Sequence, residues 1–173
     1  MNTRERIFRF LMWWTVLGFA TWVGGTMFNM LVVVPLWSAS PPESVRAIFT
    51  DAGLNKTIWN FFGPPWMALR NLPLIGALVV GWSYPMHRRL LLISVVIAVL
   101  GVAFTLVYIY PINAVLMGQP GHTASPEEMR TLVRQWVIAD RIRFTAMTLG
   151  FICMLRAFAI PCPSQKEVPS NAA

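Results

Sequence analysis

One acidic and two basic side chains stand directly beside an apolar run near the end of the chain. Asp140, Arg141 and Arg143 precede the apolar segment from Phe144 to Leu155. That segment spans only about 18 Å as a helix, whereas the hydrocarbon core of a bilayer is about 30 Å thick. A helix that crosses here must carry the charges into or against the bilayer. Such charges are costly, and they usually pair, face the bundle interior and serve a function.

Helical spacing decides which of these side chains share a face. Trp136, Asp140 and Arg143 follow one another at intervals of four and three residues, so they lie on one side of a helix. Arg141 lies off this face, and it either snorkels to the headgroups or joins the site. We therefore expect a polar site that contains an aromatic ring, a carboxylate and a guanidinium.

Four apolar segments are expected to position this site. The chain has 173 residues, of which 56% are hydrophobic and 12% charged, a profile typical of an integral membrane protein. The fourth helix is expected to begin near residue 126, because Ser125 is a good cap and Pro126 suits a first helical position. This start is expected to lie outside the membrane. We predict an all-α, four-helix transmembrane bundle with up-down-up-down topology in a single domain, residues 1–160. The expected spans are about 10–36, 64–82, 90–110 and 136–160, with an outer loop at 37–63.

The distribution of basic residues predicts the orientation. They cluster before the first span and between the second and third, at Arg4, Arg6, Arg9, His87, Arg88 and Arg89. The positive-inside rule therefore places both termini in the cytoplasm, and it explains the net charge of +7 without nucleic acid as a partner. We expect a multi-pass protein of the bacterial cytoplasmic (inner) membrane. The Pro/Ser-rich stretch 161–173 is expected to be a disordered cytoplasmic tail.

Polar residues of four different helices fall at a similar depth. Counting from the basic ends puts Asp140 and Arg70 each about 24 Å into the membrane, with Asn29 and Asn113 nearby. If these residues face inward, Asp140 pairs with Arg70 or Arg143 and leaves an excess of positive charge. The plainer alternative is that Arg70 and Asp140 form a purely structural pair between helices.

Two asparagines allow two interpretations each, and other residues are expected to cap or anchor the bundle. Asn71 either bonds backbone groups freed by Pro73 or belongs to the site. Asn113 either ends the third helix with Pro111 or binds a ligand. The segment 55–60 is expected to cap the bundle from outside. Four tryptophans are expected to be interface anchors, namely Trp13, Trp14, Trp37 and Trp82.

Motifs in the second half of the chain resemble a known family. The third helix ends in Tyr110-Pro111-Ile112-Asn113, and an outer loop leads to Glu127-Glu128-Met129-Arg130 and then to Trp136-x3-Asp140-Arg141-x-Arg143. This order resembles the anthrone oxygenase-like family of small four-helix membrane proteins, many of which have no known function. The likeness extends over most of the chain through helix count and loop lengths, and its specific part covers residues 110–143. It implies an oxygenase of aromatic, anthrone-like substrates that uses O₂ without metal or flavin.

The resemblance gives each polar residue a role. In cofactor-free oxygenation an electron-rich carbanion or phenolate reduces O₂ directly, so the site needs a base and a means of stabilising an anion. Asp140 would be the base or orient one, and Arg143 and Arg70 would stabilise the anion. An ionised Asp140 held by arginine would be a poor base. The substrate-binding residues would be Trp136, Asn113, Asn71, Asn29, Tyr110, Arg141 and Trp59.

Cofactors and partners follow from what the sequence offers. It has no Cys/His metal set, no dinucleotide-binding glycine motif and no haem pair, so we expect no metal and no cofactor. The expected partners are the lipid bilayer, a hydrophobic aromatic small molecule and a second copy of the chain. Two other functions stay open: non-catalytic binding of a lipid, quinone or other apolar anion, and a structural membrane subunit whose charged pair sets helix register. An enzyme predicts a pocket lined by Asp140, Arg143 and Trp136 together.

Overall fold

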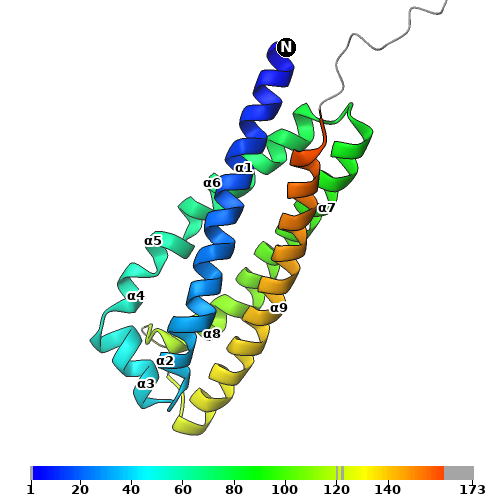
Figure 1. The fold of residues 1–173 in the computed structure, drawn as a ribbon. Coiled ribbons are helices and arrows are strands. Elements are labelled where there is room, and N and C mark those ends of the chain that lie inside the picture. Colours follow the sequence, from blue (N-terminus) through cyan, green and yellow to red (C-terminus); the bar gives the residue numbers. More distant parts are fainter. Residues whose placement is uncertain (1, 120, 122, 162–173) are drawn as a thin grey trace, which may run out of the picture.

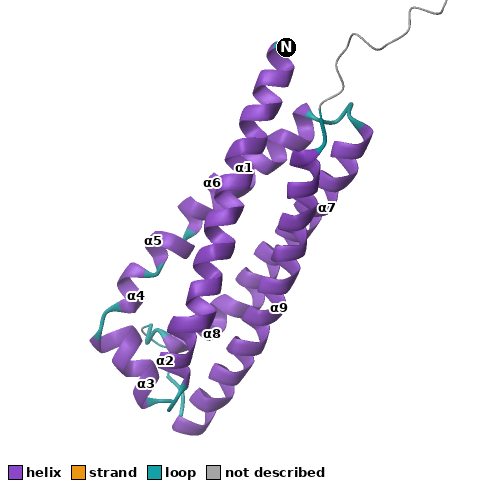
Figure 2. Cartoon of the chain, in the orientation of Figure 1, coloured by secondary structure: helices purple, strands orange, loops and turns teal. Residues whose placement is uncertain are grey.

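The computed structural model describes residues 2–119, 121 and 123–161, and this part of the chain consists of helices joined by short loops, without strands (Figure 2). The predicted all-α class is confirmed. The tail predicted to be disordered lies outside the described residues from position 162 onward. The elements in chain order are α1 (Thr3–Phe28), the π-helical η1 (Asn29–Val33), α2 (Val34–Ser38), α3 (Glu43–Arg46), the π-helical η2 (Ala47–Asp51), α4 (Leu54–Thr57), α5 (Trp59–Phe62), α6 (Pro64–Val80), α7 (Pro85–Phe104), the π-helical η3 (Thr105–Ile109), α8 (Tyr110–Leu116) and α9 (Pro126–Ala159).

Capping side chains start the first and last helices. Asn2 and Glu5 form a reciprocal capping box at the start of α1, and Ser125 and Glu128 form another at the start of α9. Each box satisfies backbone N–H groups that have no partner within the helix. Pro126 occupies the first turn of α9, where its missing N–H costs nothing.

The third apolar helix does not stop at the Tyr110-Pro111 motif. It runs without a break from Pro85 to Leu116 through α7, η3 and α8. Pro111 removes one backbone donor, and the chain accommodates it directly after the π-helical turn Thr105–Ile109. The reading of this motif as a plain helix stop is therefore wrong.

Within the described residues, three continuous helices are long and apolar enough to cross a membrane: Thr3–Ser38, Pro85–Leu116 and Pro126–Ala159. Their outward faces carry large apolar side chains, such as Leu17, Val107 and Ile142, each at least 60% exposed. Such a surface needs lipid around it, so the chain is an integral membrane protein. The remaining long helix, α6, has 17 residues and a length of about 26 Å.

The long helices pack pairwise, α1 against α6 and α9, and α7 against α6 and α9. Small residues allow close approach: a Cβ atom built on Gly18 would lie 3.5 Å from the Cα atom of Arg70. Figure 1 shows α2, α3, α4 and α8 toward the end of the molecule away from the N-terminus, with α5 leading from α4 back to α6. The stretch 37–63, expected as an outer loop, is thus largely short helices that fold over this end.

A glycine marks the turn where this outer segment joins α6. Gly63 follows α5, and a Cβ atom added to it would lie 2.2 Å from the carbonyl oxygen of Trp59. We expect Gly63→Ala to lower the free energy of unfolding by about 1–3 kcal/mol, because the backbone must shift to relieve the clash. Thermal unfolding in detergent micelles measures this. Gly24→Ala is the control, since nothing lies within 4 Å of a Cβ atom there; equal unfolding temperatures for both variants would contradict the prediction.

Candidate functional site

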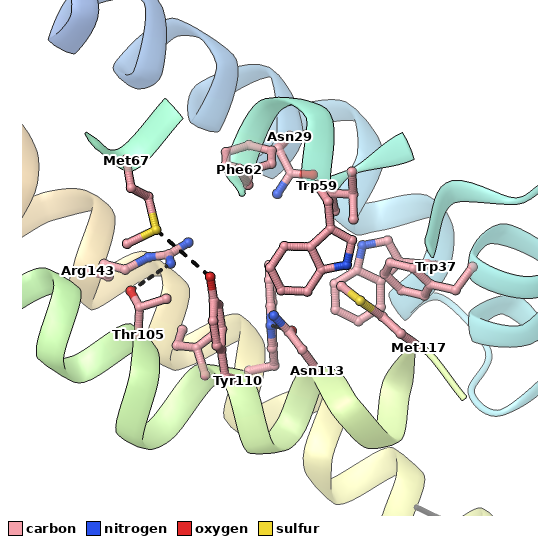
Figure 3. Close-up of a pocket in the computed structure, with 14 residues that line it drawn as sticks. Asn29, Trp37, Trp59, Phe62, Met67, Thr105, Tyr110, Asn113, Met117 and Arg143 are labelled. Atoms are coloured by element: carbon pink, nitrogen blue, oxygen red, sulfur yellow. Dashed lines mark hydrogen bonds between the residues drawn. The ribbon is translucent and has the colours of Figure 1, made fainter. Parts of the chain in front are cut away.

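A cavity lies beneath the outer segment, between it and the long helices. We call it the aromatic cavity. Its volume is about 70 Å³. Figure 3 shows its side chains converging from several elements. The lining residues are Asn29, Trp37, Phe49, Ile58, Trp59, Phe62, Met67, Thr105, Ile109, Tyr110, Asn113, Met117, Trp136 and Arg143.

Packed aromatic rings build the walls of this cavity. The Trp37 ring meets the Trp136 ring edge to face, with centroids 5.0 Å apart, and also contacts Phe49. Trp59 meets Tyr110 in the same manner at 5.3 Å. Edge-to-face pairs hold their rings in defined orientations. The cavity is therefore walled by aromatic rings held in fixed orientations.

A hydrogen bond between two of the lining residues fixes the direction of an amide. The indole N–H of Trp136 donates to the Oδ1 atom of Asn113 at 2.6 Å. Because the amide oxygen is occupied, the NH₂ group of Asn113 is left as a donor. Asn29, on η1, adds a second buried amide to the lining. The site can thus donate hydrogen bonds to a carbonyl or phenolate oxygen.

The guanidinium of Arg143 is held by two partners on different helices. One Nη atom donates to a carboxylate oxygen of Asp140. The other donates to the Thr105 hydroxyl at 3.0 Å (Figure 3). The Thr105 hydroxyl itself donates to the carbonyl of Gly101 at 2.7 Å, so its lone pairs are free to accept from Arg143. The cation is thereby oriented, and its remaining N–H groups are available to an anion.

Asp140 lies behind Arg143 and does not line the cavity. It is 1% exposed, and its second carboxylate oxygen has no hydrogen-bond partner. The carboxylate therefore neutralises and orients Arg143 from the protein side. This geometry favours a positioning role over direct proton removal from a molecule in the cavity.

Arg70 provides a second buried cation next to the pair. It is 6% exposed, and its guanidinium carbon lies 4.7 Å from the Trp22 ring and 5.1 Å from the Phe19 ring. Arg143 approaches the same Trp22 ring at 6.0 Å. The structure pairs Asp140 with Arg143, while two Arg70 nitrogens are buried without a partner. The buried layer thus combines two guanidinium groups with one carboxylate.

All three π-helical segments contribute side chains to the cavity. Asn29 begins η1, Phe49 lies in η2, and Thr105 and Ile109 lie at the two ends of η3. A π-helical turn inserts an extra residue, which rotates the following side chains around the helix. Such turns frequently occur at functional sites. The irregular helices are concentrated where the cavity needs particular side-chain directions.

The structure brings together most of the residues that the sequence singled out. Six of them line the aromatic cavity, namely Asn29, Trp59, Tyr110, Asn113, Trp136 and Arg143. Asp140 and Arg70 lie behind the lining. Two residues lie elsewhere: Arg141 is exposed, and Asn71 lines a separate groove between α6 and α7. Neither Arg141 nor Asn71 is placed for direct contact with a molecule in the aromatic cavity.

Other lining residues were not foreseen. Trp37, expected as an interface anchor, is 1% exposed and forms part of the cavity wall. Thr105, Ile109 and Met117 are spaced from Asn113 by multiples of four residues. They therefore share its helix face, and this spacing could have identified them from the sequence. Phe49 and Phe62 lie in the outer segment, where no periodicity pointed to the site. Among the described residues, no group of three or more His, Cys, Asp or Glu side chains is arranged to hold a metal ion.

The fold and the site define an all-helical membrane protein with a buried ion pair beside an aromatic cavity. A family model described as anthrone oxygenase matches residues 58–153, more than half of the chain. The chain therefore belongs to the anthrone oxygenase family. The matched region includes Trp59, Asn113 and the Asp140–Arg143 pair, and it begins after Asn29 and Trp37. No curated protein and no solved structure matches the chain.

The charge balance of the buried layer predicts a coupling between Asp140 and Arg143. Asp140→Asn leaves two buried cations without a carboxylate, and we expect it to lower the free energy of unfolding by about 3–5 kcal/mol. Adding Arg143→Gln removes one of those cations and should recover part of the loss. Thermal unfolding of both single variants and the double variant in detergent measures the coupling. A double variant whose loss equals the sum of the two single losses would contradict the prediction.

Proposed function

We propose that this protein is a cofactor-independent monooxygenase that oxidises hydroxylated, anthrone-like aromatic molecules with O₂. One observation carries the proposal: an oriented guanidinium, that of Arg143, lines a cavity walled by aromatic rings. The rings suit a planar polycyclic substrate, and the cation suits the anion that such a substrate forms. Membership of the anthrone oxygenase family supports the same reaction class.

The proposed setting is a bundle that crosses the bacterial cytoplasmic membrane four times, with both termini in the cytoplasm. The N-terminus, the start of α7 and the end of α9 lie at one end of the molecule (Figure 1). Basic residues are frequent at that end, which supports its cytoplasmic placement. The aromatic cavity then lies in the outer leaflet. Of the four proposed spans, α6 is the shortest, with 17 residues.

The proposed chemistry begins with ionisation of the substrate. In the aromatic cavity the anthrone loses a proton from its methylene carbon to a water molecule and becomes an anthranolate, whose oxygen is stabilised by Arg143. One electron passes from this anion to O₂, giving a carbon radical and superoxide. The two radicals combine with formation of a C–O bond, and the resulting peroxide takes up a proton. Loss of water then leaves a quinone carbonyl, so one oxygen atom enters the product and the other leaves in water.

The protein's part in this scheme is binding and electrostatic stabilisation. Arg143 is fixed before the substrate arrives, so it stabilises the anion without reorganisation. Asp140 positions Arg143, and Arg70 adds positive charge behind it. The free NH₂ of Asn113, together with Asn29 and Tyr110, contacts the carbonyl and hydroxyl groups of the substrate. The rings of Trp136 and Trp59 stack on it.

A second candidate function is non-catalytic binding of a lipid, quinone or other apolar anion. It is favoured by the groove between α6 and α7, which opens sideways toward the lipid-facing surface. The same Arg143 would then hold the anionic group of a bound molecule. The two functions differ in whether O₂ is consumed.

Turnover of a hydroxylated anthrone by the full chain in proteoliposomes tests the proposed reaction. With isotopically labelled dioxygen, we expect quinone that carries one labelled oxygen atom per molecule, formed faster than in protein-free vesicles. Under anaerobic conditions no quinone should form. A rate equal to the spontaneous oxidation in empty vesicles would reject the oxygenase and favour the binding function.

A matched pair of arginine variants tests the role of the cation. We expect Arg143→Gln to lower kcat/KM about 100-fold, as loss of a preorganised anion-stabilising group does. Arg141→Gln, two residues away but exposed, should stay within about twofold of the wild type. Both are assayed in the same vesicles after thermal unfolding has confirmed that they are folded. Similar losses in the two variants would show that Arg143 has no special role.

A further inference from the structure

A second hollow lies beside the aromatic cavity, on the outside of the helix pair α6 and α7. We call it the lateral groove. Its volume is about 290 Å³. Several of its walls face outward, and Leu72 and Val99 are 65% and 56% exposed. The lining consists of Met67, Ala68, Asn71, Leu72, Leu74, Ile75, Val95, Ala98, Val99 and Val102. In a membrane this groove opens to the hydrocarbon of the bilayer.

Met67 belongs to both hollows. It lines the aromatic cavity and the lateral groove, and its sulfur accepts a weak hydrogen bond from the Tyr110 hydroxyl at 3.8 Å (Figure 3). Methionine is unbranched and flexible, so this side chain can move without displacing a helix. A movement of Met67 would join the two spaces.

The volumes of the two hollows indicate that a ligand would have to occupy both. Ligand pockets for small molecules usually measure roughly 300–1,000 Å³, and the aromatic cavity alone, at about 70 Å³, is far below that range. The lateral groove and the aromatic cavity joined together reach it. A polycyclic substrate therefore needs both spaces, and the larger one faces lipid.

A single polar residue interrupts the apolar wall of the groove. The Oδ1 atom of Asn71 is buried and has no hydrogen-bond partner. A buried acceptor without a partner is costly, and a ligand that brings an O–H group would satisfy it. A plain acyl chain has no such donor, whereas a phenol has one.

We propose that apolar phenolic molecules reach the aromatic cavity from the bilayer through the lateral groove, with Met67 as the gate and Asn71 as the acceptor for the phenol O–H. The occupant named here rests on the proposed function. The groove also explains why Asn71 is polar although it faces away from the cavity. The phenol stays neutral at Asn71 and meets the Arg143 cation only after it has passed Met67.

The test measures binding without turnover. A photoreactive diazirine derivative of a hydroxylated anthrone is added anaerobically to the full chain in vesicles of phosphatidylcholine and phosphatidylglycerol. Labelled positions are then mapped by mass spectrometry. We expect labels on the α6 and α7 walls of the groove and on the Trp136 segment. Because no O₂ is present, this test measures binding alone. A chain that is labelled here but shows no turnover in the aerobic assay would count against the reaction and not against this route.

Val99→Trp places a larger ring in the groove from an exposed position, where it needs no space in the packed core, so we expect the fold to be kept. We expect it to lower labelling of the Trp136 segment about tenfold. Leu100→Trp is the matched control, because Leu100 is 62% exposed, adjacent in sequence, and not part of the groove lining. It should label as the wild type does. Unchanged labelling of the Trp136 segment in Val99→Trp would overturn the proposed route.

Asn71→Leu tests the acceptor. It should weaken labelling of the groove by the free phenol about tenfold and leave labelling by the O-methylated probe unchanged, since only the former donates a hydrogen bond. Equal effects on the two probes would reject the role of Asn71. A photoreactive phospholipid that labels the groove undiminished by excess anthrone would show that the groove holds lipid alone, and would overturn the proposal.

Discussion

The ion pair between Asp140 and Arg143 is the interaction on which the rest of the site depends. A charged helix segment is tolerated at membrane depth only when its charges face the protein interior and find partners there. The carboxylate holds one Nη atom of the guanidinium and Thr105 holds the other, and Arg143 lines the aromatic cavity. Buried ion pairs seldom add net stability. The pair is therefore better explained by the direction it gives to Arg143.

The fold serves this arrangement through its irregular turns. A regular helix through Asn29 or through Thr105 would fix side-chain directions by the 3.6-residue period alone. The π-helical turns at both places rotate the chain so that Asn29, Thr105 and the following Tyr110 all line one cavity. The short helices of the segment 37–63 then close the cavity with Trp59 and Phe62. The regular parts of the long helices form the bundle, and the π-helical turns place several side chains in the cavity.

The sequence predicted the frame and about half of the cavity. Apolar runs and caps located the long helices, and spacing by three and four placed Trp136, Asp140 and Arg143 on one face. Trp37 could not be predicted, because only the folding back of the outer segment distinguishes a buried ring from an interface anchor. Arg70 and Asn71 illustrate a second limit. Neighbouring residues on a helix point about 100° apart. The sequence does not show how α6 packs against the other helices, so it could not predict that Arg70 faces the bundle interior and Asn71 the groove.

The excess of positive charge decides which molecules suit the site. In the low dielectric of a bundle interior, an uncompensated cation strongly favours an anion beside it. A permanently charged anion cannot cross hydrocarbon cheaply, whereas a neutral phenol or anthrone dissolves there and ionises on arrival. A substrate that is apolar in the bilayer and anionic at Arg143 satisfies both constraints. The same electrons that carry the negative charge are then available to reduce O₂. Under the proposed function, the cost of burying Arg70 and Arg143 is thus the means by which the protein selects and activates its ligand.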